Sequence, residues 1–239
     1  MKVIKSITIL AMAMLVMSAS SCKDEKYPDL GDGLYAELIT NKGIMVAELF
    51  YDKTPVTVAN FVALAEGTHP QVSDEYKGKP FYNGLTFHRV MDQFMIQGGD
   101  PQSRDARPNQ RLGTGGPGYT LEAEIGAPHL RGALAAARTG GPSNPDKRSS
   151  GSQFYIVQGR TISPQELDAF EARHNIKYNE VQRQIYTEQG GTPQLDMEYT
   201  VFGEVVEGMD VVDQIAMTNT DANDRPVEDV RMNKVSIIK

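Results

Sequence analysis

Two runs rich in strand-forming residues open the regular hydrophobic pattern of the chain. They cover residues 34–40 and 44–50 and are joined by Asn41-Lys42-Gly43. A short connection that contains glycine between two such runs is typical of a β-hairpin. We therefore predict a pair of strands here.

Two later segments have the spacing of helices with one apolar face. The first begins at Thr54-Pro55, because threonine can cap a helix and proline suits the first helical position, and it ends at Gly67. The second covers residues 208–216. The apolar positions that share a face are Val58, Phe61, Val62 and Ala65 in the first helix and Met209, Val212 and Ile215 in the second.

Short strand-like runs interrupted by glycines follow at residues 132–137, 153–158, 199–206 and 235–238. Many short strands with only two core helices predict a mainly β domain, either a barrel or a sandwich. Residues 34–239 are long enough to form one domain with its own core.

Residues 161–193 depart from this pattern. Ser163-Pro164-Gln165-Glu166 is a capping box that starts one helix, and a second polar helix over residues 179–188 ends at Gly190-Gly191. We interpret the segment as a helical insertion between two strands. It either decorates a loop, covers the edge of the barrel or serves as a docking surface.

The first residues carry a targeting pattern. Lys2 and Lys5 precede an apolar run, and three small residues then lead to Cys22. The run is shorter than the roughly 20 residues that a membrane span needs. Residues 1–21 are therefore expected to be a secretory signal.

Cys22 is the only cysteine in the chain. Its position resembles that of the lipidated cysteine of bacterial lipoproteins; an ordinary cleaved signal is the alternative. Residues 22–33 would then be a lipidated cysteine and a flexible tether. The Lys23-Asp24-Glu25 sequence is either an acidic export tag or plain solvated linker.

The charge balance limits the partners. Without residues 1–21 the chain has 22 basic and 31 acidic side chains, a net charge of −9. An acidic chain with no dense basic run binds phosphate backbones poorly, so we expect no nucleic-acid partner. We expect a monomer in the cell envelope of a Gram-negative bacterium, lipid-anchored, and either periplasmic or surface-exposed.

The stretch FHRVMDQFMIQGGD, residues 87–100, carries the most distinctive chemistry. It combines Arg89 and Gln97 with two aromatic rings and two methionines. An apolar surface with one fixed cation and one amide can hold an uncharged group and polarise a carbonyl beside it. The run contains no thiol or hydroxyl nucleophile, so we expect chemistry without a covalent intermediate.

Other motifs do not support dinucleotide or metal chemistry. GTGGPG, residues 113–118, lacks the strand before it and the helix after it that dinucleotide binding needs, so we predict a loop whose glycines allow close backbone approach. Glu122 and Glu124 are expected to be solvated, or one of them to pair with an arginine. We expect no metal, because metal-ligand spacing is missing between His69, His88, His129 and His174.

Several segments together resemble the cyclophilin family of peptidyl-prolyl isomerases. Besides residues 87–100 and 113–118, they are GALAAAR at 132–138, SGSQFYI at 150–156 and VFGEVVEGMDVVDQI at 201–215. They occur in family order. The resemblance implies a closed eight-stranded antiparallel β-barrel capped by two helices, and an isomerase that rotates X–Pro bonds without a cofactor.

The resemblance also assigns roles to individual residues. It implies that Arg89, Phe94 and Gln97 form the catalytic set, with Gln97 gripping the substrate. It places the substrate-binding residues at Met95, Ala137, Arg138, Tyr155, Leu195 and Tyr199, where Ala137 and Arg138 contact the peptide through their backbones.

Some positions differ from the family pattern. Gln194 stands where cyclosporin-sensitive members have tryptophan, so cyclosporin binding should be weak or absent. Tyr155 stands for the pocket phenylalanine, and its hydroxyl needs a partner or a water. The expected clients are proline-containing exported polypeptides. The alternative to an enzyme is a non-catalytic proline-peptide-binding module or an envelope chaperone, for which Arg89 would not be needed.

Overall fold

The computed structural model describes residues 26–108 and 110–239. The predicted signal at residues 1–21 and the predicted lipidation site Cys22 lie outside the described residues. The folded unit is Asp32–Lys239.

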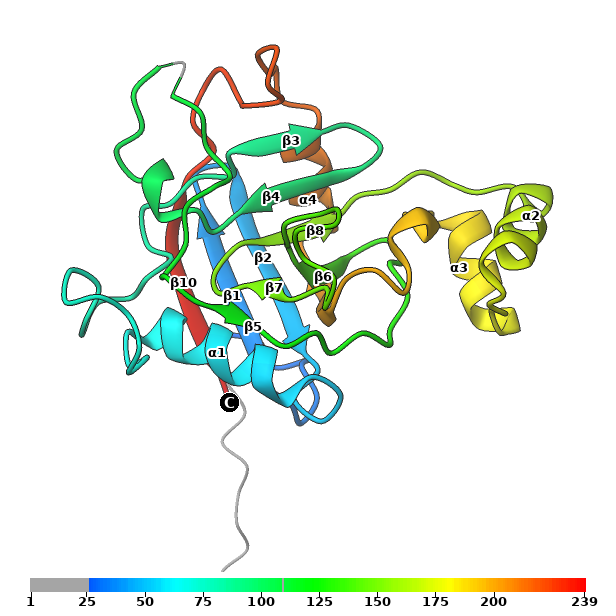
Figure 1. Ribbon diagram of the computed structural model, residues 1–239, viewed down its shortest axis with the longest axis horizontal. Coiled ribbons are helices and arrows are strands. Elements are labelled where there is room, and N and C mark those ends of the chain that lie inside the picture. Colours follow the sequence, from blue (N-terminus) through cyan, green and yellow to red (C-terminus); the bar gives the residue numbers. More distant parts are fainter. Residues whose placement is uncertain (1–25, 109) are drawn as a thin grey trace, which may run out of the picture. The chain divides into compact units, whose positions relative to one another are not determined.

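Eight antiparallel strands form one curled sheet in the order β10-β1-β2-β9-β6-β8-β4-β3, and β5 pairs with β7 in a small second sheet (Figure 1). The predicted strands are all present within a few residues of their expected bounds. The bounds are β1 (Tyr35–Thr40), β2 (Gly43–Leu49), β3 (Arg89–Met91), β4 (Met95–Gly98), β5 (Thr120–Leu121), β6 (Ala133–Ala136), β7 (Ser149–Ser150), β8 (Phe154–Val157), β9 (Val201–Glu207) and β10 (Met232–Ile238).

The eight-stranded antiparallel sheet is confirmed, but the barrel is not closed by a continuous ladder. The end strands β3 and β10 do not pair in the described chain. β3 is only three residues long, and the Val90 N–H already donates to the Asp224 carbonyl in the loop before β10. The segment before β3 connects the two ends of the sheet instead, through the Thr86–Arg231 bridge and through backbone hydrogen bonds of residues 84–87 with residues 230–232.

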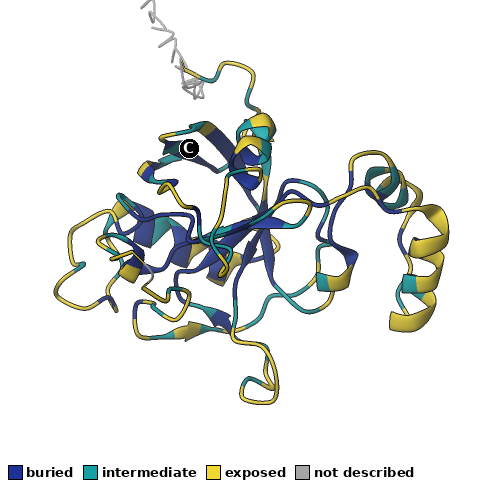
Figure 2. Ribbon diagram, turned by 90° about the horizontal axis from the view of Figure 1, so that it is seen from above, coloured by how far each residue is buried: buried dark blue, intermediate teal, exposed yellow. Residues whose placement is uncertain are grey.

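The main core cluster contains residues from most strands of the sheet, and Figure 2 shows that much of the sheet is buried. The Phe61 ring of helix α1 (Pro55–Glu66) lies 4.9 Å from Tyr82, 5.4 Å from Phe202 and 5.7 Å from Phe154. Helix α4 (Met209–Ala216) buries Val212 and Ile215 in the same core. The two predicted core helices therefore add their apolar side chains to those of the strands.

Helix α1 begins as predicted but is capped by a residue that the sequence did not indicate. The Thr54 hydroxyl donates to the Phe50 carbonyl and does not cap the helix. The Glu124 carboxylate instead accepts from the backbone N–H groups of Val56 and Thr57, at 3.1 and 2.8 Å. The expectation that Glu124 is solvated or paired with an arginine is wrong, because the unpaired N–H groups of a helix start attract a carboxylate.

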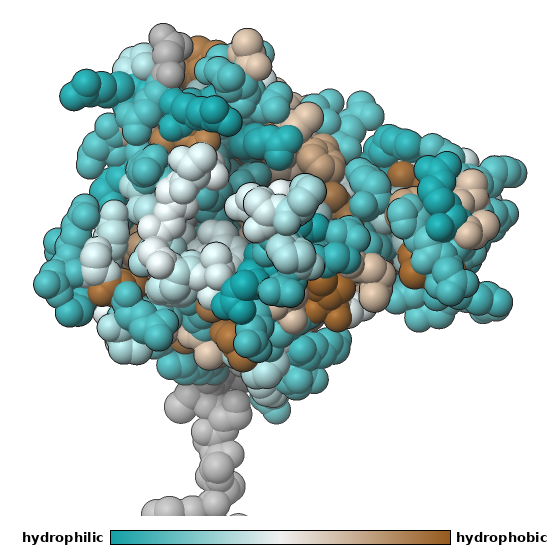
Figure 3. Space-filling view, viewed as in Figure 1, coloured by the Kyte–Doolittle hydropathy of each residue, from teal (hydrophilic) through white to brown (hydrophobic). Residues whose placement is uncertain are grey.

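The insertion contains helices α2 (Pro164–His174) and α3 (Glu180–Glu188), and both predicted starts form complete capping boxes. It projects from the sheet between β8 and β9 (Figure 1), and much of its helical surface is exposed (Figure 2). The face seen in Figure 3 is mostly hydrophilic there. A small apolar cluster of its own holds it together, formed by Ile162, Leu167, Tyr178 and Tyr186 with Leu130, Phe170 and Ile176.

Replacing Glu124 by alanine should lower the free energy of unfolding by about 1 kcal/mol, which is typical for the loss of a helix N-cap. The exposed Glu122, two residues earlier, provides the matched control Glu122→Ala. Denaturant unfolding of both variants measures the difference. Equal midpoints for the two variants would contradict the capping role.

Candidate active site

A small cavity of about 100 Å³ lies on the face of the sheet that is opposite to the core. It brings together all nine residues to which the resemblance assigned a place at the substrate, although their roles stay predictions. The lining residues are Arg89, Phe94, Met95, Gln97, Ala137, Arg138, Tyr155, Leu195 and Tyr199.

Strand register explains why residues far apart in the sequence meet here. Arg89 on β3 lies opposite Gln97 on β4, and Gln97 lies opposite Tyr155 on β8. Tyr155 in turn lies opposite Ala135 on β6. Directly opposed residues point to the same face, so one row across the sheet carries a cation, an amide and an aromatic ring.

The same alternation separates the cavity from the core. On β8, Phe154 and Ile156 belong to the core cluster, whereas Tyr155 and Val157 belong to a second apolar cluster on the opposite face. Phe94 and Leu195, from the segments beside the sheet, pack against that second cluster. The cavity therefore has apolar walls without any loss of core packing.

Arg89 is the accessible cation at the cavity, with 42% of its side chain exposed. Its Nε lies 3.6 Å from Asp224 Oδ2, and its Nη2 contacts the Met91 sulfur at 3.2 Å. Asp224 has a φ of 61° and is held by the backbone bond to Val90. A carboxylate on a constrained loop residue thus orients the guanidinium and leaves part of it exposed.

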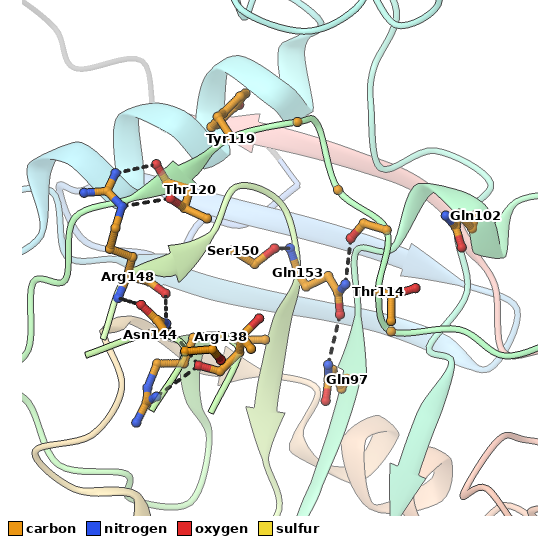
Figure 4. A pocket seen from close by; sticks show the side chains of 17 residues that line it. Gln97, Gln102, Thr114, Tyr119, Thr120, Arg138, Asn144, Arg148, Ser150 and Gln153 are labelled. Atoms are coloured by element: carbon orange, nitrogen blue, oxygen red, sulfur yellow. Dashed lines mark hydrogen bonds between the residues drawn. The ribbon is translucent and has the colours of Figure 1, made fainter. Parts of the chain in front are cut away.

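A chain of amides links the cavity to a larger neighbouring groove, drawn in Figure 4. The Gln97 Nε2 donates to Gln153 Oε1 at 3.1 Å, and the Gln153 Nε2 donates to the Gly115 carbonyl at 2.7 Å. The groove has a volume of about 1090 Å³ and shares Gln97, Ala137 and Arg138 with the small cavity. An extended peptide could occupy both spaces at once.

Ala137 and Arg138, which the resemblance assigns to backbone contacts with the peptide, have different surroundings. The Ala137 N–H donates to the Gln153 carbonyl, so it is not available to a peptide. The Arg138 guanidinium pairs with Glu198 at 2.7 Å and lies 4.7 Å from the centre of the Tyr199 ring. The Arg138 side chain therefore holds the cavity rim in place.

The hydroxyl of Tyr155 has a partner that the sequence did not indicate. It lies 2.9 Å from Nε2 of His129, and the His129 Nδ1 lies 2.9 Å from Asp196 Oδ1. His129 was not expected to have a role, because its two partners lie 26 and 67 residues away in the chain. The only local sign of this contact in the sequence is that Asp196, a partner of His129, directly follows the cavity residue Leu195.

Comparison with known proteins agrees with this geometry. A family model described as cyclophilin type peptidyl-prolyl cis-trans isomerase/CLD matches residues 35–237. The chain belongs to this cyclophilin family. The fold and the isomerase activity that the resemblance implied are thereby confirmed.

Relatives resemble the chain over most of their length. A protein of Staphylococcus saprophyticus, named as a peptidyl-prolyl cis-trans isomerase, is 34% identical over 223 residues, which are 89% of this chain and 98% of the relative. A Mycobacterium leprae protein named as peptidyl-prolyl cis-trans isomerase A is 36% identical over 213 residues, covering 84% and 91%. The crystal structure of a Cryptosporidium parvum cyclophilin shares the fold, with a TM-score of 0.57, 22% identity and coverage of 86% and 97%.

The cyclophilin's glycine-rich loop folds around a buried carboxylate. Asp100, fully buried, accepts from the N–H groups of Gly113 at 2.6 Å and Gly115 at 3.2 Å. A β-carbon on Gly115 would lie 2.1 Å from Asp100 Oδ1. The predicted close backbone approach is therefore made to a side chain of the same protein, and glycine is required for it.

His88 lies in this cyclophilin beside the same loop, with a β-carbon on Gly113 falling 3.5 Å from its Nε2. Burial is the main reason that the pKa of His88 is lowered to about 4. The imidazole is therefore neutral at ordinary pH.

Alanine at Gly115 should cost about 1–3 kcal/mol of folding free energy, as overpacking commonly does. Gly116→Ala is the matched control in the same loop, because the nearest atom to its β-carbon would be Ser150 Oγ at 4.0 Å. Denaturant unfolding of both variants checks the difference. A Gly115→Ala variant as stable as Gly116→Ala would show that the contact with Asp100 is not constraining.

Proposed function

We propose that this cyclophilin accelerates X–Pro rotation in exported polypeptides, in the envelope of a Gram-negative bacterium, with Arg89 as its catalytic residue. The observation that carries the proposal is the small apolar cavity with a partly exposed guanidinium at its edge and a larger peptide-sized groove beside it.

The reaction needs only the rotation of one bond. The barrier to amide rotation is about 18–20 kcal/mol, because the C–N bond has partial double-bond character. Spontaneous X–Pro exchange takes tens to hundreds of seconds. A catalyst must therefore favour the twisted amide, whose nitrogen has lost its conjugation and become a better hydrogen-bond acceptor.

Arg89 is suited to that task. Its guanidinium keeps its charge at any working pH and presents N–H donors in a rigid plane. Donation to the proline nitrogen or to its carbonyl would stabilise the twisted state more than either planar form. Asp224, 3.6 Å from the Arg89 Nε, would limit the positions that the guanidinium samples.

The remaining residues would position the peptide. Phe94, Met95, Tyr155 and Leu195 would bury the proline ring, and Gln97 would hold the flanking backbone, already oriented by Gln153. The larger groove has room for the residues that precede or follow the proline. A second crystal structure of the Cryptosporidium parvum cyclophilin was determined in the presence of the dipeptide Ala-Pro, which supports a proline ligand for this site.

The envelope location rests on the sequence of the first 22 residues. Lipid chains at Cys22 would anchor the protein by burying methylene groups, each worth about 0.8 kcal/mol. In the part of the chain that the structure describes, no helix has the length and apolar character needed to cross a bilayer. The proposed partners are unfolded or partly folded exported chains that contain proline, with no nucleic acid and no second subunit.

Weak cyclosporin binding also remains part of the proposal. Gln194, at the position of the tryptophan in sensitive members, is exposed and does not line the small cavity. It offers no indole ring to an apolar ligand.

Arg89→Ala should reduce isomerisation of a proline test peptide by about 10²-fold or more, which is the usual effect of losing one key electrostatic donor. Arg173→Ala on the exposed surface of α2 is the control for removing an arginine and should retain full activity. A protease-coupled assay measures both. If the wild type were inactive and still bound proline peptides, the alternative of a non-catalytic binding module would be correct.

Cys22→Ala should abolish incorporation of a labelled fatty acid in cells, while Ser21→Ala, a change from one small residue to another, should retain it. Protease treatment of intact cells then separates a surface location, in which the protein is degraded, from a periplasmic one. Labelling that persists in Cys22→Ala would exclude the lipid anchor.

A further inference from the structure

A buried hydrogen-bond network connects the helical insertion to the proline cavity. Its centre is Asp196, whose side chain is 4% exposed. Asp196 Oδ2 accepts from the hydroxyls of Tyr178 and Tyr186, both at 2.6 Å. Asp196 Oδ1 accepts from the backbone N–H of His129 at 2.6 Å and faces its Nδ1 at 2.9 Å.

The donors and acceptors of this network fit together in one way when His129 is neutral. A carboxylate only accepts, so the imidazole proton lies on Nδ1 and points to Asp196. Nε2 is then the acceptor for the Tyr155 hydroxyl, 2.9 Å away. Burial raises the pKa of Tyr155, Tyr178 and Tyr186, so all three phenols stay protonated donors.

The insertion is attached to the domain next to this network. Gly191 forms bridges with Leu130 and with Arg160, and the Thr192 N–H donates to the His129 carbonyl at 2.9 Å. A β-carbon on Gly191 would lie 2.5 Å from the Tyr186 ring and 2.6 Å from that carbonyl. The two ends of the insertion therefore fix the backbone on which His129 stands.

We propose that the insertion is a positioning element of the active site: Tyr178 and Tyr186 hold Asp196, which through His129 fixes the hydroxyl and the ring of Tyr155 in the cavity wall. The Tyr155 ring stacks on His129 with an interplanar angle of 12° and meets Tyr199 edge-on at 86°. A displaced Asp196 would therefore move two walls of the cavity. Tyr155 would move because it depends on His129, and Leu195 would move because it directly precedes Asp196.

This arrangement also explains why tyrosine replaces phenylalanine at position 155. A phenylalanine would leave the buried Nε2 of His129 without its donor, which is costly in the protein interior. The hydroxyl is thus the point at which the insertion acts on the site.

The test is the double variant Tyr178→Phe/Tyr186→Phe in the full chain, which removes two hydroxyls and keeps both rings. We expect kcat/KM for a proline test peptide to fall roughly five- to tenfold, as loss of hydrogen bonds to a buried charged group implies. The ring nitrogen NMR shifts of His129, which report its hydrogen bonds, should change in the same variant. Tyr76→Phe, which removes a half-buried hydroxyl elsewhere, is the control and should change neither.

A double-mutant cycle with Tyr155→Phe tests the route. In the Tyr155→Phe background, the changes at Tyr178 and Tyr186 should alter kcat/KM less than twofold, because their effect passes through that hydroxyl. A wild-type kcat/KM in the Tyr178→Phe/Tyr186→Phe variant, or an effect independent of Tyr155, would overturn the proposal.

The inference rests on the proposed role of the cavity, and the two can fail separately. If Arg89→Ala retained activity, the cavity itself would be the wrong site. If Arg89→Ala lost activity while the tyrosine variants retained it, only the role of the insertion would be refuted.

Discussion

The two-residue period of the strands is the constraint on which this protein depends. Along β8, Phe154 and Ile156 point into the core, and Tyr155 and Val157 point to the opposite side. A shift of one residue in the pairing with β4 would exchange these sets and place the cavity residues in the core. Fold stability and the geometry of the site are therefore fixed by the same hydrogen-bond register.

Three carboxylates organise the segments that the sheet does not reach. Glu124 caps the start of α1, Asp100 gathers the N–H groups of the glycine-rich loop, and Asp196 ties the insertion to His129. Each accepts at least one backbone N–H that would otherwise be unpaired. Since an unpaired buried polar group costs about 1–3 kcal/mol, each carboxylate helps to fix the segment that it contacts.

The site is arranged to hold a substrate in place and is not arranged to transfer protons. Its cation is an arginine that does not titrate, and the nearby His88 is neutral because it is buried. The hydroxyl of Tyr155 donates a hydrogen bond to His129. The polar groups around the cavity are fixed by neighbours before a substrate arrives. Such a preorganised site suits the rotation of an amide, which makes and breaks no covalent bond.

Much of this could be predicted from the sequence, because the signals are local. Turn glycines, capping boxes and helical spacing predicted most of the helices and strands. The motif around Arg89 and Gln97 resembled one family. The same resemblance predicted which residues line the small cavity. The cavity confirms that these residues meet, although their roles remain to be measured.

Only the tertiary structure decided which polar groups meet across long distances. Glu124 lies 67 residues from Thr57, and Asp196 lies 67 residues from His129. No periodicity connects such pairs, because a hydrogen bond between distant segments depends on how the strands and loops are arranged in space. The incomplete closure of the barrel was equally hidden, since it depends on a loop carbonyl taking the N–H of Val90. The sequence by itself determined most of the elements and the residues that line the cavity, and the tertiary structure determined the partners that hold them there.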